Sequence, residues 1–172
     1  IQVMFKKNSC TDCGAWVDAC PVGIHVLSKE TGKHMIRRDI DCTGCRKCKA
    51  SCPQSAIEIT GEMKTISELL KLVEEDSAFY ETSGGGVTLG GGECTSQPEA
   101  AKSLLMACKE QGINTAIETC GHLKTEKLLQ IAEYVDLFLY DIKHMDPVRH
   151  NELTGISNDL ILFNLNELLR RR

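Results

Sequence analysis

The sequence predicts an α/β fold with a parallel sheet, preceded by a small module that cysteines organise. From residue 62 onward, strands and helices alternate at intervals of about 25 residues, the pattern of βαβ units with right-handed crossovers. Seven of the ten cysteines instead lie before residue 61, where apolar periodicity is weak. We therefore expect two domains, residues 1–61 and residues 62–172.

The composition limits the class of protein. A chain of 172 residues and 19.0 kDa is long enough to bury roughly 70% of its unfolded surface. Hydrophobic residues make up 42% of it and charged residues 26%, which is typical of globular proteins. The net charge of -4 disfavours a nucleic-acid partner. No apolar run reaches the roughly 18 residues that a membrane span needs, so no membrane partner is expected.

The chain begins at Ile1 rather than Met, and no segment of the secretory type follows. We therefore expect a cytoplasmic protein, and a chain that is cut from a longer one. In a reducing compartment, clustered cysteines more often hold metal than form disulfides.

In the α/β part, helices are expected after Thr65, from Pro98, after Thr125 and up to Arg172. The expected strands are 86–89, 115–117 and 135–142. The last of these strands is apolar on both faces, which indicates burial within a parallel sheet. Three strands do not close a barrel and leave long unpaired edges. Either partner strands come from elsewhere, or the chain is an excerpt.

The module before residue 61 contains shorter strand signals. Segments 25–27 and 35–37 flank a turn at Gly32, where glycine supplies the positive φ of a hairpin. Residues 56–60 alternate between apolar and polar side chains, as a half-buried strand does.

A run of four cysteines carries the strongest signal in the chain. It fits the C-x-x-C-x-x-C-x-x-x-C-P pattern of bacterial ferredoxins and ends at Pro53. Two-residue intervals let three thiolates of one loop reach three irons of a cluster, while the fourth cysteine serves a second cluster. Tetrahedral zinc is the competing interpretation, since C-x-x-C pairs suit it as well. The four residues are Cys42, Cys45, Cys48 and Cys52.

An earlier run repeats this pattern with Trp16 in place of the third cysteine. By ferredoxin cross-ligation, one complete four-iron four-sulfur (4Fe-4S) cluster uses Cys20 together with Cys42, Cys45 and Cys48. The second site keeps three thiolates, and an indole nitrogen offers iron no lone pair. We expect a three-iron cluster there, a labile four-iron cluster with a non-cysteine ligand, or an empty site. Its cysteines are Cys10, Cys13 and Cys52.

Glycines and polar residues follow the three expected strands. Residues 83–93 place glycine runs around the first strand and end in Glu93, and Glu118 lies at the end of the second. Asp141 and Lys143 follow the core of the third. Since ligands of α/β folds bind at the carboxyl edge of the sheet, these groups indicate a converging charged site. A flexible loop and a surface ion pair are the simpler alternatives, and the glycines match neither a P-loop nor a dinucleotide fingerprint.

These motifs together resemble one enzyme family. Residues 83–88, the triplet Gly91-Gly92-Glu93 and residues 97–99 are similar to the signature of glycyl-radical-enzyme activating enzymes of the pyruvate formate-lyase activating type. Segments 115–119, 141–143 and 150–155 match the same family in order and spacing. The resemblance implies a partial TIM-type barrel, with βα repeats on a parallel sheet, and an N-terminal two-cluster ferredoxin-like α+β insert.

The resemblance also implies cofactors and partners. In this family a reduced 4Fe-4S cluster cleaves S-adenosylmethionine (SAM), and the 5'-deoxyadenosyl radical removes hydrogen from a glycine of a partner glycyl radical enzyme. Flavodoxin or ferredoxin is the expected electron donor. Carried over by position, the triplet Gly91-Gly92-Glu93 receives the methionine amino group. Asp141 and Lys143 contact the methionine carboxylate end, and Glu118 falls where related enzymes hold a monovalent cation.

The sequence departs from this family in one decisive respect. The radical-forming motif of the family, C-x-x-x-C-x-x-C, is not found in this sequence. We therefore assign no catalytic residue, and expect this chain alone to be inactive, as an internal fragment of such an enzyme. Trp16, Gly90 and Cys94 are smaller departures, at positions where Cys, Ser and Pro are usual.

Two other functions are compatible with the sequence. One is a ferredoxin-like electron-transfer module whose α/β part is only a scaffold, and the other is a non-catalytic remnant. An electron carrier has no use for Glu93, Asp141 and Lys143, whereas Trp16 and the absent motif favour a remnant.

Overall fold

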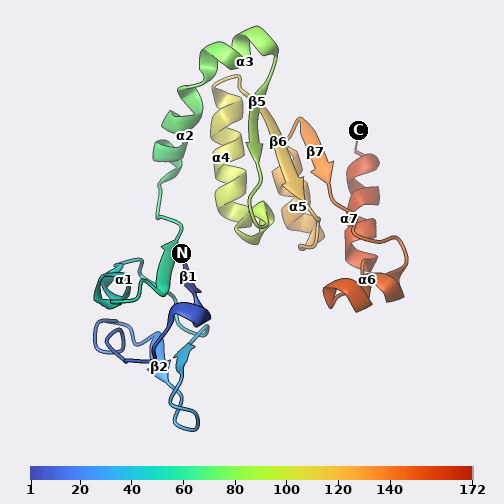
Figure 1. Ribbon diagram of the computed structural model, residues 1–172. Coiled ribbons are helices and arrows are strands. Elements are labelled where there is room, and N and C mark those ends of the chain that lie inside the picture. The colour runs from blue at the N-terminus through green and yellow to red at the C-terminus, as the bar shows by residue number, and fades with distance from the viewer. Residues whose placement is uncertain (172) are drawn as a thin grey trace. The chain divides into compact units, whose positions relative to one another are not determined.

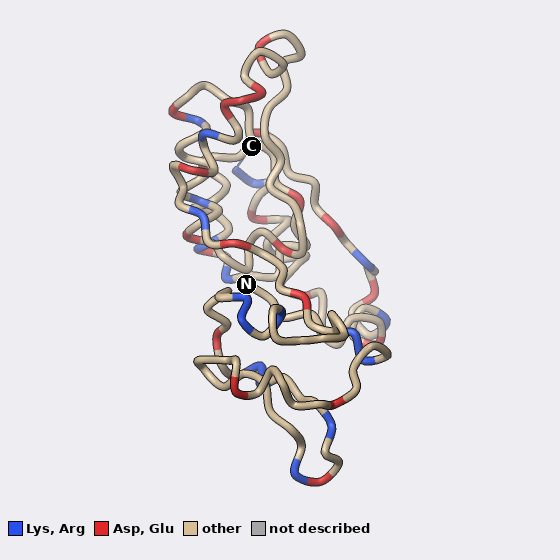
Figure 2. The backbone as a smooth tube through the Cα atoms, turned by 60° about the vertical axis from the view of Figure 1, so that its left-hand side comes forward, with Lys and Arg blue, Asp and Glu red and all other residues tan. Residues whose placement is uncertain are grey.

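The computed structural model describes residues 1–171, which form two compact units. The first unit is Ile1–Met63 and the second is Lys64–Arg172, so the boundary falls just after the predicted position. Figure 1 follows the chain from its blue N-terminal strand to its red final helix. Figure 2 shows basic and acidic residues interspersed along the backbone of both units. Among the described residues, no helix combines the length and apolarity that crossing a bilayer requires.

The unit Ile1–Met63 is built on two antiparallel strand pairs, β1 with β4 and β2 with β3. The hairpin β2–β3 and the strand β4 confirm the prediction. Strand β1 was not predicted. Its inward residues Val3 and Phe5 alternate with Met4, and because Met4 is also apolar, the alternation typical of a half-buried strand is hidden. The elements are β1 (Gln2–Phe5), η1 (Lys7–Ser9), β2 (His25–Leu27), β3 (His34–Ile36), α1 (Lys47–Ser51) and β4 (Ile57–Thr60).

The core of this unit mixes aliphatic side chains with sulfur. Val3 and Ile57 belong to the same buried cluster as Trp16, Cys48 and Cys52. Trp16 is only 1% exposed, so the residue that interrupts the cysteine pattern lies inside the unit. A pair of two-stranded ladders buries little apolar surface, and such ladders are marginally stable on their own.

The unit Lys64–Arg172 contains a parallel sheet of three strands in the order β5-β6-β7. The register places Thr88 beside Ala116, and Ala116 beside Leu137, so the three carboxyl ends meet at one edge. This arrangement confirms the predicted parallel α/β sheet. The strands are β5 (Gly86–Leu89), β6 (Asn114–Thr119) and β7 (Leu137–Tyr140).

Helices cover one face of this sheet. Helix α4 packs against α2 and α5, and α5 packs against α7, as can be followed in Figure 1. Leu105 on α4, Ile117 on β6 and Ile131 on α5 share one fully buried cluster. The helices are α2 (Ile66–Glu74), α3 (Ser77–Ser83), η2 (Cys94–Ser96), α4 (Pro98–Glu110), α5 (Thr125–Ala132), α6 (Pro147–Thr154) and α7 (Asp159–Leu169). Arg172, the predicted end of the last helix, lies outside the described residues.

The opposite face of the sheet is exposed among the described residues. Leu137 and Leu139 of β7 are 51% and 46% exposed. The prediction that this strand is buried on both faces is therefore wrong here, because the helices cover only the face that carries Phe138 and Tyr140. Glu118 of β6 is in register with Leu139 and so shares this open face.

The predicted start of α2 is confirmed in detail. The Thr65 hydroxyl accepts a hydrogen bond from the Glu68 backbone N–H at 3.2 Å, and the Glu68 carboxylate accepts one from the Thr65 backbone N–H at 2.7 Å. This reciprocal capping box satisfies two backbone donors that the helix itself leaves unpaired. The predicted start of α4 is confirmed as well, with Pro98 in the first turn.

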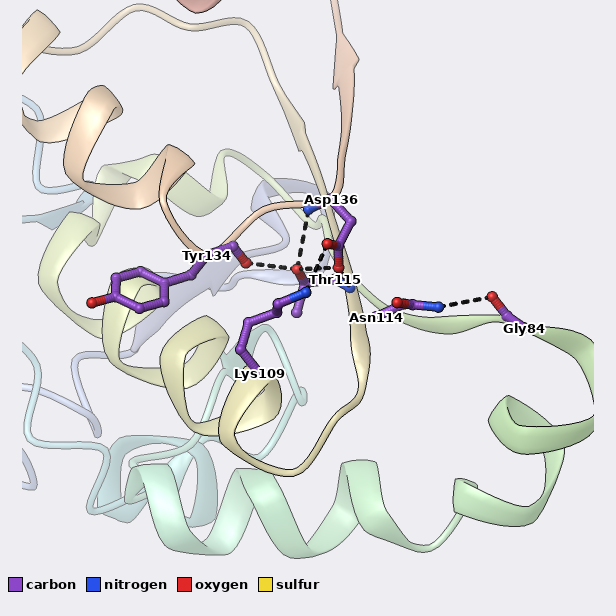
Figure 3. Close-up of polar contacts among 6 residues, drawn as sticks. All are labelled: Gly84, Lys109, Asn114, Thr115, Tyr134 and Asp136. Atoms are coloured by element: carbon purple, nitrogen blue, oxygen red, sulfur yellow. Dashed lines mark hydrogen bonds and ion pairs between the residues drawn. The ribbon is translucent and has the colours of Figure 1, made fainter. Parts of the chain in front are cut away.

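A polar cluster ties the amino ends of the strands together (Figure 3). Asp136 accepts hydrogen bonds from the backbone and the hydroxyl of Thr115, at 2.8 and 3.1 Å, and pairs with Lys109 at 2.7 Å. The Asn114 amide donates to the Gly84 carbonyl at 3.0 Å. These contacts fix the amino edge of the sheet and leave the carboxyl edge to the glycine-rich loop.

Candidate functional site

A cavity of about 230 Å³ opens at the carboxyl edge of the sheet. The loop after β5 and the ends of β6 and β7 form it. All six residues that the sequence assigns to cofactor binding line this cavity, although their role in binding stays a prediction. Thr119 and Cys120 line it as well, outside the predicted set. The lining residues are Gly91, Gly92, Glu93, Glu118, Thr119, Cys120, Asp141 and Lys143.

Glu93 ties the glycine-rich loop to the end of β6. Its Oε1 accepts hydrogen bonds from the Thr95 backbone (3.1 Å), the Thr95 hydroxyl (2.6 Å) and the Thr119 hydroxyl (2.7 Å), and its Oε2 accepts one from the Cys120 backbone (2.9 Å). Burial raises the pKa of Glu93, but these hydrogen bonds to the charged form outweigh it and lower the pKa to about 2. Glu93 is therefore an anion at neutral pH, and its Oε2 has capacity for a further donor.

Glycines keep the loop beside Glu93 open. Gly91 has φ +103°, which L side chains rarely adopt, and no described atom beyond its chain neighbours lies within 4 Å of the place where its Cβ would be. A Cβ at Gly90 would lie 3.3 Å from Oε2 of Glu118, so this glycine gives the Glu118 carboxylate its space. A ligand can therefore approach the backbone of this loop closely.

Asp141 and Lys143 form an ion pair at the cavity. The Asp141 backbone N–H donates to the Thr119 carbonyl at 2.9 Å, which holds the end of β7 against the end of β6. The hydrogen bond with Asp141 raises the pKa of Lys143. The cavity thus presents three carboxylates and one ammonium, a set that suits a ligand carrying both an amino group and a carboxylate.

Cys120 lines this cavity, and Cys94 is joined to it through a hydrogen bond to the Glu118 carbonyl. Burial, followed by the charge of Glu93, raises the pKa of Cys94 to about 11. Burial is also the largest cause that raises the pKa of Cys120. Both are therefore thiols at neutral pH, and Cys94 donates to the Glu118 carbonyl at 3.4 Å. A protonated thiol is a poor nucleophile and a poor metal ligand.

Electrostatic interactions between thiols link several cysteines of the first unit, and the cluster ligand sets stay a prediction. Burial raises the pKa of the Cys48 thiol, and the nearby thiols of Cys20, Cys42 and Cys45 add to this electrostatically. Burial also raises the pKa of Cys10, and Cys52 is among the groups that add to it. Within residues 1–171, no three His, Cys, Asp or Glu side chains are grouped as a single metal ion requires. A four-iron cube is larger than one ion, so its thiolate ligands stand further apart.

Backbone N–H groups already point at three of these sulfurs. Asp12 donates to Cys10 at 3.3 Å, Gly44 donates to Cys42 at 3.4 Å, and Ala56 donates to Cys52 at 3.3 Å. Hydrogen bonds to sulfur favour the thiolate and tune a bound cluster. The thiols and the backbone donors around them therefore fit an iron-sulfur cluster.

Aromatic rings fill the space around Trp16. Its indole lies against the His34 imidazole, with ring centroids 3.8 Å apart, and Phe5 contacts the same imidazole edge-on at 4.2 Å. His34 in turn lies within hydrogen-bond distance of His25, with 2.9 Å between Nε2 and Nδ1. No local sequence pattern predicts this buried pair, because its two members lie on separate strands of the hairpin.

Comparisons with known proteins agree with this geometry. Residues 9–57 match the 4Fe-4S dicluster domain, and residues 40–172 match the Radical SAM superfamily. The chain is 58% identical over 171 residues to the choline trimethylamine-lyase activating enzyme of Oleidesulfovibrio alaskensis. The aligned region covers 99% of this chain and 55% of the relative. The chain is 38% identical over 172 residues to the isethionate sulfite-lyase activating enzyme of Nitratidesulfovibrio vulgaris, with coverage of 98% and 55%.

A third relative is the trans-4-hydroxy-L-proline dehydratase activating enzyme of Clostridioides difficile, 40% identical over 165 residues, with coverage of 95% of this chain and 54% of the relative. The chain thus spans about half the length of the curated relatives it matches. The family match from residue 40 onward includes all three strand ends that form the cavity. Since that match extends over more than half of its residues, this chain belongs to the radical SAM superfamily.

Proposed function

We propose that this chain is part of an activase that generates a glycyl radical on a partner enzyme by reductive cleavage of SAM. One observation carries the proposal: a radical SAM chain gathers all six predicted SAM-binding residues around one cavity at the carboxyl edge of its sheet. The names of the relatives support it, since each of those described above is an activating enzyme.

The residues of the cavity have separate tasks in this proposal. Glu93, held as an anion, and the open backbone of Gly91 and Gly92 receive the methionine ammonium. Lys143 receives the methionine carboxylate, and Asp141 orients Lys143 through their ion pair. Glu118 lies on the open face of the sheet and lines the cavity, and in this proposal it binds a cation. When bound, a reduced 4Fe-4S cluster supplies the electron that cleaves the sulfonium of SAM.

In this proposal the first unit transfers electrons and the second unit binds SAM. Residues 1–61 form a ferredoxin-like module in which Cys20 joins three cysteines of the later run to hold an auxiliary cluster, and electrons enter from flavodoxin or ferredoxin in the cytoplasm. Residues 62–172 form a partial TIM-type barrel that binds SAM. The grouped thiols around Cys48 and the match to a dicluster domain support the first assignment. The three parallel βα strands support the second.

We further propose a choline trimethylamine-lyase as the partner enzyme. The support is the difference in identity, 58% to the activating enzyme named for that lyase against 38% and 40% to those named for two other enzymes. A pull-down of the purified protein with choline trimethylamine-lyase and, separately, with isethionate sulfite-lyase measures the preference. Equal retention by both would contradict this choice of partner.

Calorimetric titration with SAM tests the proposed site. Asp141→Ala and Lys143→Ala are each expected to weaken binding about tenfold, because the first removes the ion pair that orients Lys143 and the second removes the charge-assisted contact with the methionine carboxylate. Glu133→Ala is the matched control, since Glu133 is exposed at the end of α5 and does not line the cavity. Unchanged affinity in both cavity variants, or an equal loss in the control, would contradict the assignment.

An electron-transfer module is the second candidate, favoured by the dicluster match over residues 9–57. It predicts reversible reduction of a cluster without any affinity for SAM. The same titration, repeated with the reconstituted protein, separates the two functions, because only the activase requires the cavity to bind SAM.

A further inference from the structure

Helix α7 bonds to the loops that form the cavity, although none of its residues is among those lining it. Asn164 and Ile161, one turn apart on α7, each contact the end of a different strand. Asn164 holds the loop that follows β6. The Ile161 carbonyl accepts a hydrogen bond from the hydroxyl of Tyr140, the last residue of β7, at 2.8 Å.

Asn164 uses its whole amide on this loop. Its Nδ2 donates to the Gly121 carbonyl at 2.8 Å and to the Leu123 carbonyl at 2.9 Å, and its Oδ1 accepts from the Thr125 hydroxyl at 2.7 Å. The side chain is 0% exposed, so water cannot replace these partners when it is removed. Buried carbonyls left without donors are costly, and the loop would have to move to find others.

The last residue of β6 and the loop after it supply two of the four hydrogen bonds on Glu93. Cys120, next to Gly121, donates its N–H to Oε2 of Glu93 at 2.9 Å. The Gly121 N–H donates to the Thr119 hydroxyl at 3.0 Å, and that hydroxyl donates to Oε1 of Glu93 at 2.7 Å. The carbonyl and the N–H of Gly121 thus connect Asn164 to the carboxylate of the cavity.

The loop has little freedom to adjust. Gly121 has φ +70°, and a Cβ there would lie 1.7 Å from the Tyr140 hydroxyl oxygen. Tyr140 is itself held by Ile161 on α7. The loop is therefore fixed between Glu93, Tyr140 and Asn164, and loss of one of them shifts its position against the other two.

We propose that Asn164 is a positioning residue for the cavity. By holding the Gly121 and Leu123 carbonyls, it aligns the Cys120 N–H and the Thr119 hydroxyl with Glu93, and thereby sets the affinity of the cavity for its ligand. The identity of that ligand, SAM, rests on the proposed function. The alignment itself does not, and it can be measured separately.

Amide hydrogen exchange and SAM titration test the two parts on the same variants. Asn164→Ala is expected to speed exchange of the Cys120 amide about tenfold, to weaken SAM binding about tenfold, and to leave exchange in β5 and α4 unchanged. Asn166→Ala is the matched control, because Asn166 lies on the same helix, is exposed, and donates only to the Leu162 carbonyl of that helix. It should change neither quantity.

Asn164→Asp adds a readout that a purely structural role would not give. At pH 8 its carboxylate faces two carbonyl oxygens, so binding should be weaker than in Asn164→Ala. Near pH 5 the protonated carboxyl again donates one hydrogen bond, so the order of the two variants should reverse. Thr125→Val removes only the bond to Oδ1 and should weaken SAM binding about threefold, which keeps the test valid if Asn164→Ala does not fold.

The outcomes separate the inference from the proposed function. Unchanged exchange at Cys120 in Asn164→Ala, or wild-type SAM affinity in that variant, overturns the positioning role. Absence of SAM binding by the unmodified protein contradicts the proposed function instead, and the exchange measurement then decides the positioning role alone.

Discussion

The two units of this chain are stabilised in different ways. In Ile1–Met63 the buried side chains include two cysteines, two histidines and Trp16, gathered around two-stranded ladders. In Lys64–Arg172 a layer of helices packs aliphatic side chains such as Leu105 and Ile131 onto a three-stranded sheet. A small unit with few aliphatic contacts needs ligands to hold it, whereas a layered unit obtains its stability from packing.

Removal of iron should show this contrast most strongly. In reconstituted protein treated with an iron chelator, amides of Ile1–Met63 are expected to lose protection about a hundredfold or more, since cluster binding and folding are coupled. Amides of α4 and β6 should keep theirs. Hydrogen exchange followed by mass spectrometry reports both units in one experiment. Equal loss in the two units, or none in the first, would refute the contrast.

A glycine substitution should destabilise the second unit, mainly through steric overlap. Gly121→Ala is expected to cost about 3 kcal/mol of unfolding free energy, because its Cβ overlaps Tyr140 and its φ is +70°. Gly112→Ala is the matched control: its φ is +72°, but no described atom beyond its neighbours lies within 4 Å, so only about 1 kcal/mol is expected. Urea unfolding measures both. Equal losses of unfolding free energy in the two variants would show that backbone strain, rather than overlap with Tyr140, causes the destabilisation.

Acid should weaken the second unit through Glu93. Its pKa is lowered from 4.5 to about 2 in the folded chain, so the stabilisation is present above pH 4.5 and is lost as the pH falls toward 2. The contribution at neutral pH is on the order of 1–2 kcal/mol after allowance for its partial exposure. Urea unfolding of wild type and Glu93→Gln between pH 2 and pH 7 isolates this contribution. A difference in unfolding free energy that stays constant across that range would contradict the lowered pKa of Glu93.

A surface ion pair should have the smallest effect. Lys127 and Glu99 join α5 to α4, but their side chains are 43% and 67% exposed. Glu99→Gln is therefore expected to cost about 0.5 kcal/mol or less, and this difference should shrink in 0.5 M salt. A loss above about 1 kcal/mol in thermal unfolding would mean that charge, as well as packing, stabilises this unit.

Most of the sheet and its helices could be predicted because their signals are local. The capping box at Thr65, Pro98 and the apolar run of β7 each mark an element within a few residues. Two helices lack such an apolar period. Helix α3 exposes Phe79, and α6 is mostly polar. The signal that would have found α6 is the Asp146 cap followed by Pro147, with Gly155 at the far end.

The cavity was predictable for a topological reason. Parallel strands bring their carboxyl ends to one edge, so Glu93, Glu118 and Asp141 had to converge once the strands were assigned. The hydrogen bonds that hold the cavity loops in place were not predictable. Asn164 reaches its loop partners across 39 to 43 residues of chain, and no local pattern encodes such a contact. The exposed face of β7 was missed for the same reason, since burial depends on what packs against a strand.

The histidine pair of the first unit has a consequence for where hydrogens lie. Burial, followed by the charge of His25, lowers the pKa of His34 to about 4, so its ring is neutral at neutral pH. Nδ1 of His34 is buried and has no partner among residues 1–171. A buried N–H without an acceptor is rarer than a buried lone pair. The hydrogen between the rings therefore belongs to Nε2 of His34, and Nδ1 of His25 accepts it. One hydrogen thus determines the tautomers of two residues. A side chain at position 25 that can only donate a hydrogen bond would leave the Nε2 hydrogen of His34 without an acceptor.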